Sequence, residues 1–199
     1  THPNNEVLFM AFLKDGSNKV ISFAEFTDVV QKDQRIFESN NLKIPAQSGF
    51  LTTEDFVEDM LQKSTNRLAL KIKASTWWSS YNYYVGNSFD PNDRPNVDLD
   101  KIDPSNTLGR QQQFTDMCVY YCFAEYLFPL FAEFGNDDSP EVAKITYYTN
   151  KYNDLFNELL AIADWYDNDG DGTVEATEKA TSFSKTRRTR TRPTIVQVR

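Results

Sequence analysis

Apolar residues recur along most of the chain at intervals of three and four, the spacing of one face of an α-helix. This pattern predicts helices over Glu6–Leu13, from Phe23 to about Phe37, and from Glu54 onward through Leu68. A further amphipathic helix is predicted from the apolar set Tyr152, Leu155, Phe156, Leu159, Ile162, Ala163 and Tyr166. Strand-like alternation is almost absent, so the predicted fold class is all-α.

Local signals indicate where some of these helices begin or bend. The segments Ser22–Glu25 and Thr52–Asp55 have the spacing of capping boxes, in which side chains satisfy the free N–H groups of a first helical turn. Ser139–Glu141 places a proline at the first helical position, where its missing N–H costs nothing. Pro129 is expected to kink the aromatic stretch 120–134.

The strongest chemical signal is the acidic segment 167–178, which reads Asp-Asn-Asp-Gly-Asp-Gly-Thr-Val-Glu-Ala-Thr-Glu. Calcium takes six to eight oxygen ligands, and a twelve-residue loop supplies them from positions one, three, five, seven, nine and twelve. Those positions hold Asp167, Asp169, Asp171, Thr173, Glu175 and Glu178, with Thr173 contributing its backbone carbonyl. Gly172 at position six permits the sharp turn. Val174 at position eight is the apolar residue that pairs neighbouring loops through a short strand.

Over these twelve residues the chain resembles the EF-hand family of calcium-binding proteins. The resemblance implies calcium as the bound ion and leaves open whether magnesium occupies the loop at low calcium. It also implies a helix that enters the loop and an exit helix that begins near Glu175 and Glu178. A solvated acidic turn is the simpler alternative. It leaves six matching residue types unexplained, and five carboxylates in one loop repel each other without a cation.

Because EF-hands normally occur in pairs, the resemblance implies weaker units elsewhere. Lys14–Glu25 has an apolar residue at position eight and an acid at position twelve, but Lys14, Gly16 and Lys19 stand where an acid, an acid and a glycine are needed. Residues from Gly49 to Phe56 look like the back half of a loop whose front half, about Asn40–Ser48, lacks carboxylates. Asp90–Lys101 carries a lysine at position twelve, which cannot accept a metal. Calcium is therefore assigned to none of these three.

The overall resemblance is to four-EF-hand proteins of the sarcoplasmic calcium-binding and calmodulin-like type. It implies EF-hand helix–loop–helix units in two compactly packed pairs, with short β contacts between paired loops, although the separation between the third loop and the last is longer than the usual spacing. The chain then divides into an N-terminal half, 1–88, with two degenerate units, and a C-terminal half, 89–184, with one degenerate and one intact unit. Residues 185–199 form a basic tail.

The charge distribution restricts the classes of partner that the chain can bind, and the cysteine content indicates its cellular compartment. The tail holds six of the 21 basic residues and no acid, which leaves 15 basic against 29 acidic residues in the remainder. So acidic a body repels nucleic acid and anionic membranes, and no apolar run is long enough to span a membrane. The tail itself is open to three interpretations: a mobile end, a segment docked on the acidic body, or a contact for an anionic partner. Cys118 and Cys122 are predicted to be buried free thiols, which favours a reducing, cytoplasmic location.

Three functions remain open on this sequence. The first is a calcium sensor or buffer, with a protein as its target. The second is a structural or interaction protein that one calcium ion stabilises. The third is a small-molecule carrier with a photoprotein-like fold, in which aromatic residues such as Trp77, Trp78, Tyr81, Tyr83 and Tyr84 would line a cavity rather than fill a core. The single histidine, His2, argues against a luminescent version of that fold.

An enzyme is not expected. The sequence contains no glycine-rich phosphate loop, no serine nucleophile elbow, and no histidine beyond His2 that could pair with a cysteine.

Overall fold

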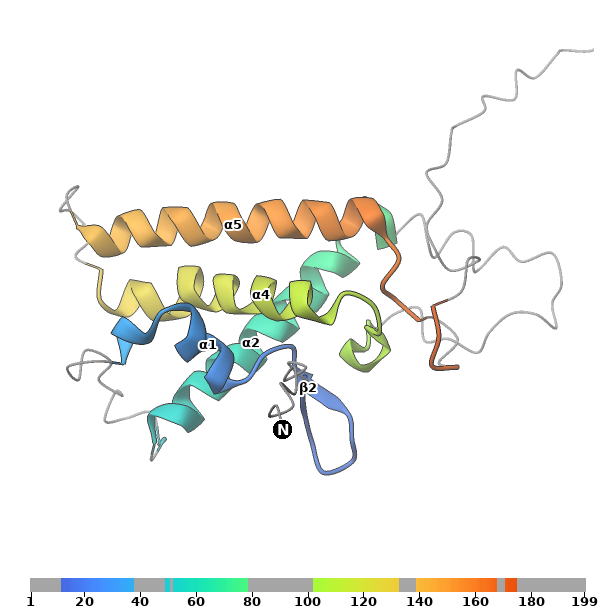
Figure 1. Cartoon of the computed structure of the whole chain (residues 1–199), viewed down its shortest axis with the longest axis horizontal. Coiled ribbons are helices and arrows are strands. Elements are labelled where there is room, and N and C mark those ends of the chain that lie inside the picture. The colour runs from blue at the N-terminus through green and yellow to red at the C-terminus, as the bar shows by residue number, and fades with distance from the viewer. Residues whose placement is uncertain are drawn as a thin grey trace, which may run out of the picture.

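The structure is a computed structural model that describes residues 12–37, 49–50, 52–78, 102–132, 139–167 and 171–174. These residues fold mostly into helices around a shared hydrophobic core, beside a small two-stranded sheet (Figure 1). The predominance of helix confirms the predicted class in its coarse form. The elements are β1 Leu13–Lys14, β2 Val20–Ser22, α1 Phe26–Lys32, η1 Gln34–Ile36, α2 Thr53–Lys73, η3 Pro104–Asn106, α4 Gln111–Cys122, η4 Phe123–Leu127, η5 Phe128–Leu130 and α5 Pro140–Ile162.

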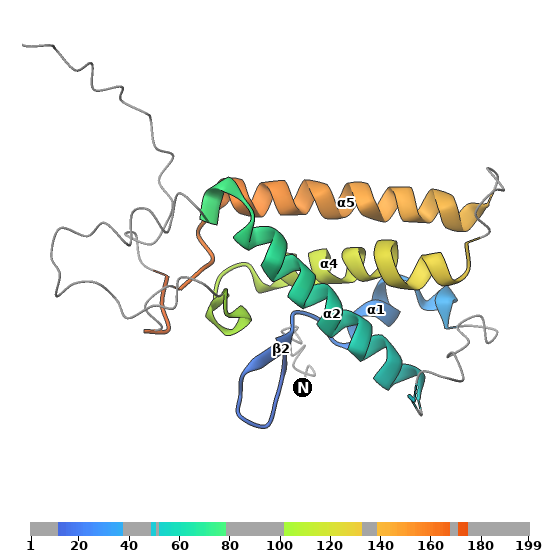
Figure 2. The ribbon, with the colours of Figure 1, turned by 180° about the vertical axis from the view of Figure 1, so that it is seen from behind.

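The three long helices form the body of the molecule. Helices α4 and α5 lie side by side in opposite directions, and α2 crosses them obliquely (Figure 2). Fully buried apolar side chains from each helix meet between them, including Leu61 and Leu68 of α2 and Met117 of α4. Burying an aliphatic side chain of this size is worth roughly 1.5–3 kcal/mol, so this shared core is what holds the helices together.

Two predicted helix starts are confirmed. Helix α2 begins after Thr52, whose side-chain oxygen accepts the backbone N–H of Asp55 at 3.1 Å. Helix α5 begins at Pro140 after Ser139, with proline in the first turn as expected. Both starts are set by residues adjacent in sequence, which is why the local pattern located them.

The start of α1 differs from the prediction. The expected capping box Ser22–Glu25 is wrong, because α1 begins later, at Phe26, with Glu25 as its N-cap. The backbone N–H of Glu25 donates to the carboxylate of Asp28 at 2.8 Å. Ser22 is instead the last residue of β2, and its hydroxyl donates to the carbonyl of Ala24 at 2.8 Å. The helix expected from Phe23 to Phe37 is accordingly only Phe26–Lys32, followed by the short turn η1.

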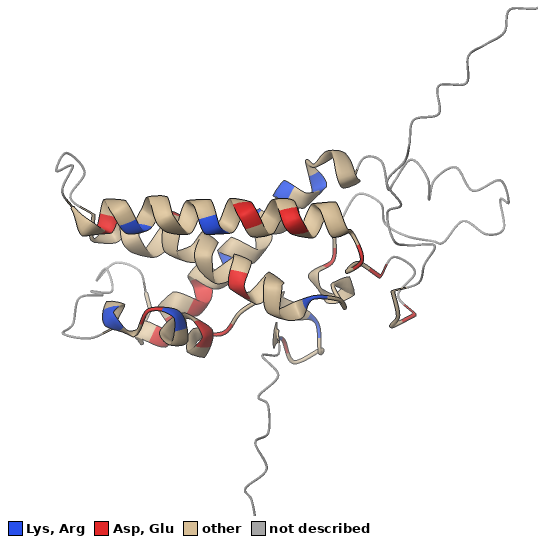
Figure 3. Ribbon diagram, turned by 45° about the horizontal axis from the view of Figure 1, so that its top comes forward, with Lys and Arg blue, Asp and Glu red and all other residues tan. Residues whose placement is uncertain are grey.

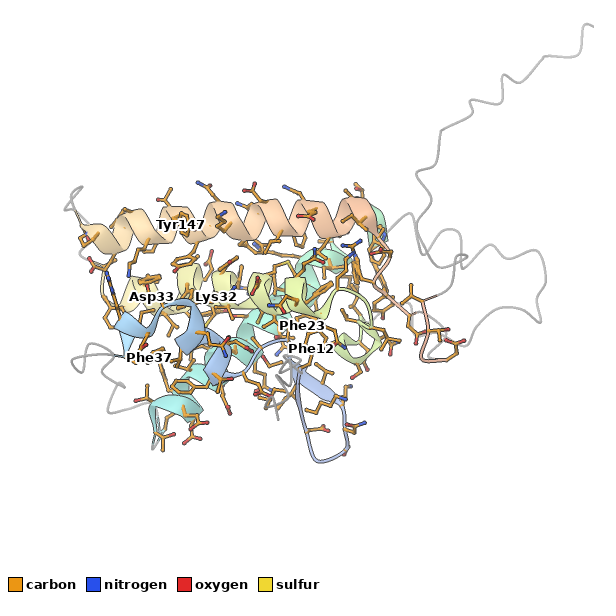
Figure 4. The ribbon with its side chains drawn as sticks, in the orientation of Figure 1. Phe12, Phe23, Lys32, Asp33, Phe37 and Tyr147 are labelled. Carbon is orange, nitrogen blue, oxygen red and sulfur yellow. The ribbon has the colours of Figure 1, made fainter. Side chains whose placement is uncertain are left out.

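The segment Lys14–Glu25, predicted to be a degenerate EF-hand unit, contains a β-hairpin. Strands β1 and β2 pair in antiparallel fashion, so Leu13 is extended rather than helical as predicted; residues 6–11 of that predicted helix lie outside the described residues. The turn is held by Asp15, whose Oδ1 accepts the N–H groups of Ser17 at 2.8 Å and Lys19 at 2.9 Å. The hairpin joins the core through Phe23, which lies against Phe12 with ring centroids 5.0 Å apart (Figure 4).

The aromatic stretch beyond α4 changes its helical form twice. Helix α4 passes into the π-helical segment η4 at Phe123 and then into the 3₁₀ turn η5 at Phe128. Pro129 lies in η5, where it provides no N–H to the hydrogen-bond ladder, and the kink expected at this residue stays a prediction. Cys118 and Cys122 are both free and fully buried, also as predicted.

Charged residues of both signs are interspersed over the helices (Figure 3). Lys32 pairs with Asp116 at 2.8 Å, and Lys144 pairs with Asp33 at 2.7 Å. Among the described residues, no helix has the length and apolarity needed to cross a membrane. Asn40–Ser48, Asp90–Lys101, the three tyrosines at 81, 83 and 84, and the tail 185–199 fall outside the described residues.

Candidate metal centre

The predicted calcium loop begins at Asp167, which is almost completely buried, with 2% of its surface exposed. Its Oδ2 accepts the backbone N–H of Gly172 at 2.9 Å. This hydrogen bond spans five residues and turns the chain back on itself between positions one and six of the predicted loop. The first predicted ligand therefore lies at the base of a closed turn.

Gly172 makes that turn possible. Its φ of +91° lies in a region that residues with a side chain rarely adopt. The residues on either side of Gly172 are also hydrogen-bonded to each other: Asp171 Oδ1 accepts both the N–H and the hydroxyl of Thr173, each at 2.8 Å. Asp171, Gly172 and Thr173 are all exposed. The structure assigns no strand at Val174, so the pairing expected at position eight is not seen there.

The entering helix ends earlier than predicted. Helix α5 stops at Ile162, because Ala163 adopts a left-handed conformation with φ of +52°. The N–H of Ala163 still makes the last helical hydrogen bond, to the carbonyl of Leu159 at 3.0 Å. The indole N–H of Trp165 donates to the same carbonyl at 2.7 Å. The prediction that Ala163 and Tyr166 belong to the helix is therefore wrong. An extended segment, 164–167, connects α5 to the loop.

This extended segment is paired with the chain around η3. Thr107 and Tyr166 form an antiparallel β-bridge, and the N–H of Asp167 donates to the carbonyl of Asn106 at 2.8 Å. The carbonyl of Trp165 accepts the N–H of Leu108 at 3.0 Å. A short β contact next to the loop thus exists, but it precedes Asp167 rather than passing through Val174.

An aromatic cluster is formed by the residues that immediately precede Asp167 and their neighbours. Trp165 is fully buried, with ring centroids 4.7 Å from Trp77, 4.9 Å from Phe114 and 5.8 Å from Tyr166. Trp77 and Trp78 also contact each other, at 5.8 Å. These rings pack against one another, which agrees with a core role for the tryptophans. The cluster links the loop to the start of α4 through Phe114.

The structure describes only part of the predicted ligand set. Asp167, Asp171 and Thr173 are described, whereas Asp169, Glu175, Glu178 and the predicted exit helix lie outside the described residues. Within the described ranges, no group of three or more His, Cys, Asp or Glu side chains gathers as a metal site would require. The groups present do fit the predicted ion: carboxylate and carbonyl oxygens are hard donors of the kind that calcium takes, and a buried carboxylate favours a nearby cation.

Sequence reasoning missed the residues that hold the loop base, notably Asn106 and Thr107. They fall at the end of the Pro-, Asn- and Asp-rich stretch 90–109, which the pattern marks only as a long loop. No local signal ties them to Tyr166 and Asp167, roughly sixty residues later. No protein-family model, curated protein sequence or solved structure matches this chain.

Proposed function

We propose that this chain is a calcium-binding protein that holds one calcium ion in the loop 167–178 and acts as a calcium sensor or buffer. The proposal rests on the twelve-residue ligand pattern together with one structural observation. That observation is the hydrogen bond from the Gly172 N–H to the buried carboxylate of Asp167. A calcium loop of this type needs a tight turn at position six that directs position one inward.

The burial of Asp167 favours this function over a plain acidic turn. A surface turn leaves its carboxylates in water, where they need no partner. Asp167 as a whole residue is buried, and a carboxylate that loses hydration on burial needs hydrogen bonds or a cation to offset the loss. The Gly172 N–H supplies one such interaction, and a calcium ion would supply a stronger one. Asp169, Glu175 and Glu178 are the proposed remaining side-chain ligands, and magnesium would use the same oxygens at low calcium.

The position of Trp165 supports a sensor over a simple buffer. It lies two residues before Asp167, and its ring contacts both Trp77 and Phe114. Any displacement of Asp167 on closing the loop would act on this aromatic cluster and hence on α4. A sensor needs such a connection between its metal and its helices.

Calorimetric titration with calcium tests the proposal. We expect one ion per wild-type chain, with the affinity reduced by tenfold or more in Asp167→Asn. Asp154→Asn is the matched control, since it removes the same charge from an exposed position on α5 and should leave calcium binding unchanged. Absence of calcium binding by the wild type, or equal affinity in Asp167→Asn, would refute the proposal.

A second measurement separates a sensor from a buffer. A sensor should bind more of a hydrophobic fluorescent dye when calcium is added, because the helices rearrange and expose apolar surface. A buffer should bind calcium with no change in dye fluorescence.

A further inference from the structure

We propose that the segment 103–110 positions the calcium loop, with Gly109 and Arg110 as positioning residues that set the affinity for calcium. This inference rests on the function proposed above and names what regulates that site. In EF-hand pairs the supporting contact joins two loops. Here the contact comes from a segment that provides none of the proposed ligands and lies over fifty residues away in sequence.

Backbone hydrogen bonds fix the position of the residues that lead into the predicted loop. Asn106, Leu108 and Gly109 hold the carbonyl of Trp165 and the N–H of Asp167 through three hydrogen bonds of 2.8–3.1 Å. On the far side of the bridge, the N–H of Asp103 donates to the phenol oxygen of Tyr166 at 3.3 Å. Residues 165–167 are therefore held by hydrogen bonds to their backbone and to the side chain of Tyr166.

Arg110 adds a charged, two-pronged contact to this segment. Its Nε donates to Asp164 Oδ1 at 2.6 Å, and its Nη2 donates to Asp164 Oδ2 at 2.9 Å. Both side chains are about one-third exposed, so the pair is only partly screened by water. A bidentate arginine–carboxylate pair fixes orientation as well as distance, which a lysine would not do. The pair thus sets the path of the chain three residues before Asp167.

Gly109 permits the close approach of the two segments. A Cβ atom at this position would lie 2.8 Å from the carbonyl oxygen of Asp164 and 2.9 Å from the Cα of Trp165. Both atoms belong to the backbone, so they cannot move aside as the end of a flexible side chain could. Any larger residue at position 109 would push the segment 164–167 away from the segment 103–110.

The consequence for calcium is preorganisation. If Asp167 is already held in place, the loop has less conformational freedom to lose when the ion binds, so the affinity is higher. Loosening the contacts of 103–110 should weaken calcium binding, and by reciprocity calcium should strengthen those contacts.

Charge alone predicts the opposite result for Arg110, which makes the test sharp. Removing a cation near an acidic loop should tighten calcium binding if only the electrostatic field matters. Removing a positioning residue should weaken it. We therefore expect calcium affinity to fall about threefold to tenfold in Arg110→Met and by at least as much in Gly109→Ala, which changes no charge.

The experiment is a calcium titration of the full chain at 0.15 M and 0.5 M KCl, with helicity followed by circular dichroism. Lys144→Met is the matched control, because it breaks an ion pair of similar length with Asp33 near the other end of α5. It should lower thermal stability without changing calcium affinity. The charge-exchanged double variant Arg110→Asp, Asp164→Arg should recover part of the lost affinity, which a general loss of stability would not explain.

Each outcome decides between the hypotheses. Weaker binding in both positioning variants, with normal binding in the control, supports the inference. Unchanged or tighter binding in Arg110→Met at both salt concentrations overturns it and leaves the proposed function intact. A wild-type chain that binds no calcium overturns the proposed function and this inference together. If Gly109→Ala fails to fold, Arg110→Met and the double variant still decide the question.

Discussion

Replacing Gly172 by alanine should weaken calcium binding by about fivefold to thirtyfold. The φ angle of Gly172 is +91°, and a residue with a Cβ pays roughly 1–2 kcal/mol to adopt the left-handed region. No atom lies within 4 Å of the position that the new Cβ would occupy, so the cost comes from the backbone and not from a clash. Neighbouring Asp171 and Thr173 are exposed, so the loop without metal can relax while the loop with calcium cannot. A cost of 1–2 kcal/mol on the bound state corresponds to the stated loss of affinity.

Two other glycines provide matched controls, and calorimetry at constant salt is the assay. Gly16 has equal space around it but no positive φ, so Gly16→Ala should change neither stability nor calcium affinity appreciably. Gly49 has a φ of +77° and open space, so Gly49→Ala should lower stability while leaving calcium affinity unchanged. If Gly172→Ala bound calcium as tightly as the wild type, the argument that the turn at this position shapes the site would be refuted.

Three further predictions concern the aromatic cluster, a buried acid and the thiols. Calcium should change the tryptophan fluorescence of the wild type, and Trp165→Phe should lose most of that response; a full response in this variant would contradict the role of the cluster. Burial raises the pKa of Asp28 in the folded state, so its protonation favours folding below the unfolded pKa and this benefit is lost as pH rises through the folded pKa. Asp28→Asn should therefore be more stable than the wild type in urea at pH 7, with a difference that shrinks toward pH 4. Burial likewise raises the pKa of the Cys118 thiol to about 12 and that of Cys122 further, so neither should react with a thiol reagent at pH 8 before the protein unfolds.

The sequence located those helices whose start is decided by neighbouring residues. Thr52 and Pro140 mark the starts of α2 and α5 because a cap or a proline acts on the adjacent turn alone. The end of α5 was misplaced for a related reason. Ala163 and Tyr166 continue the apolar spacing past Ile162 and are buried, but Ala163 is a left-handed cap and Tyr166 lies in a β-bridge rather than in the helix. Periodicity reports which residues are buried and cannot tell these two backbones apart when only a few residues are involved.

The hairpin β1–β2 and the contacts of 103–110 depend on pairing that the pattern did not reveal. The hairpin strands are two and three residues long, too short for alternation to register, although Asp15-Gly16 is a turn signal. Asp164 and Arg110 are separated by 54 residues, and no local sequence pattern around either residue predicts that they pair. The sharp turn predicted at Gly172, by contrast, is present in the structure, because a glycine at that position is a local signal, whereas the calcium ligands stay a prediction.

The π-helical segment η4 makes the molecule sensitive to the number of residues in it rather than to their identity. Phe123 and Phe128 are five residues apart, which in an α-helix would turn them about 140° away from each other. The wider turn of η4 brings both onto one face, and both rings lie against Tyr148 of α5, at centroid distances of 4.7 Å and 5.5 Å. Substitution of a side chain between them leaves this alignment in place. Insertion or deletion of a single residue there would turn one ring off the contact with α5, so the spacing itself is what this part of the core requires.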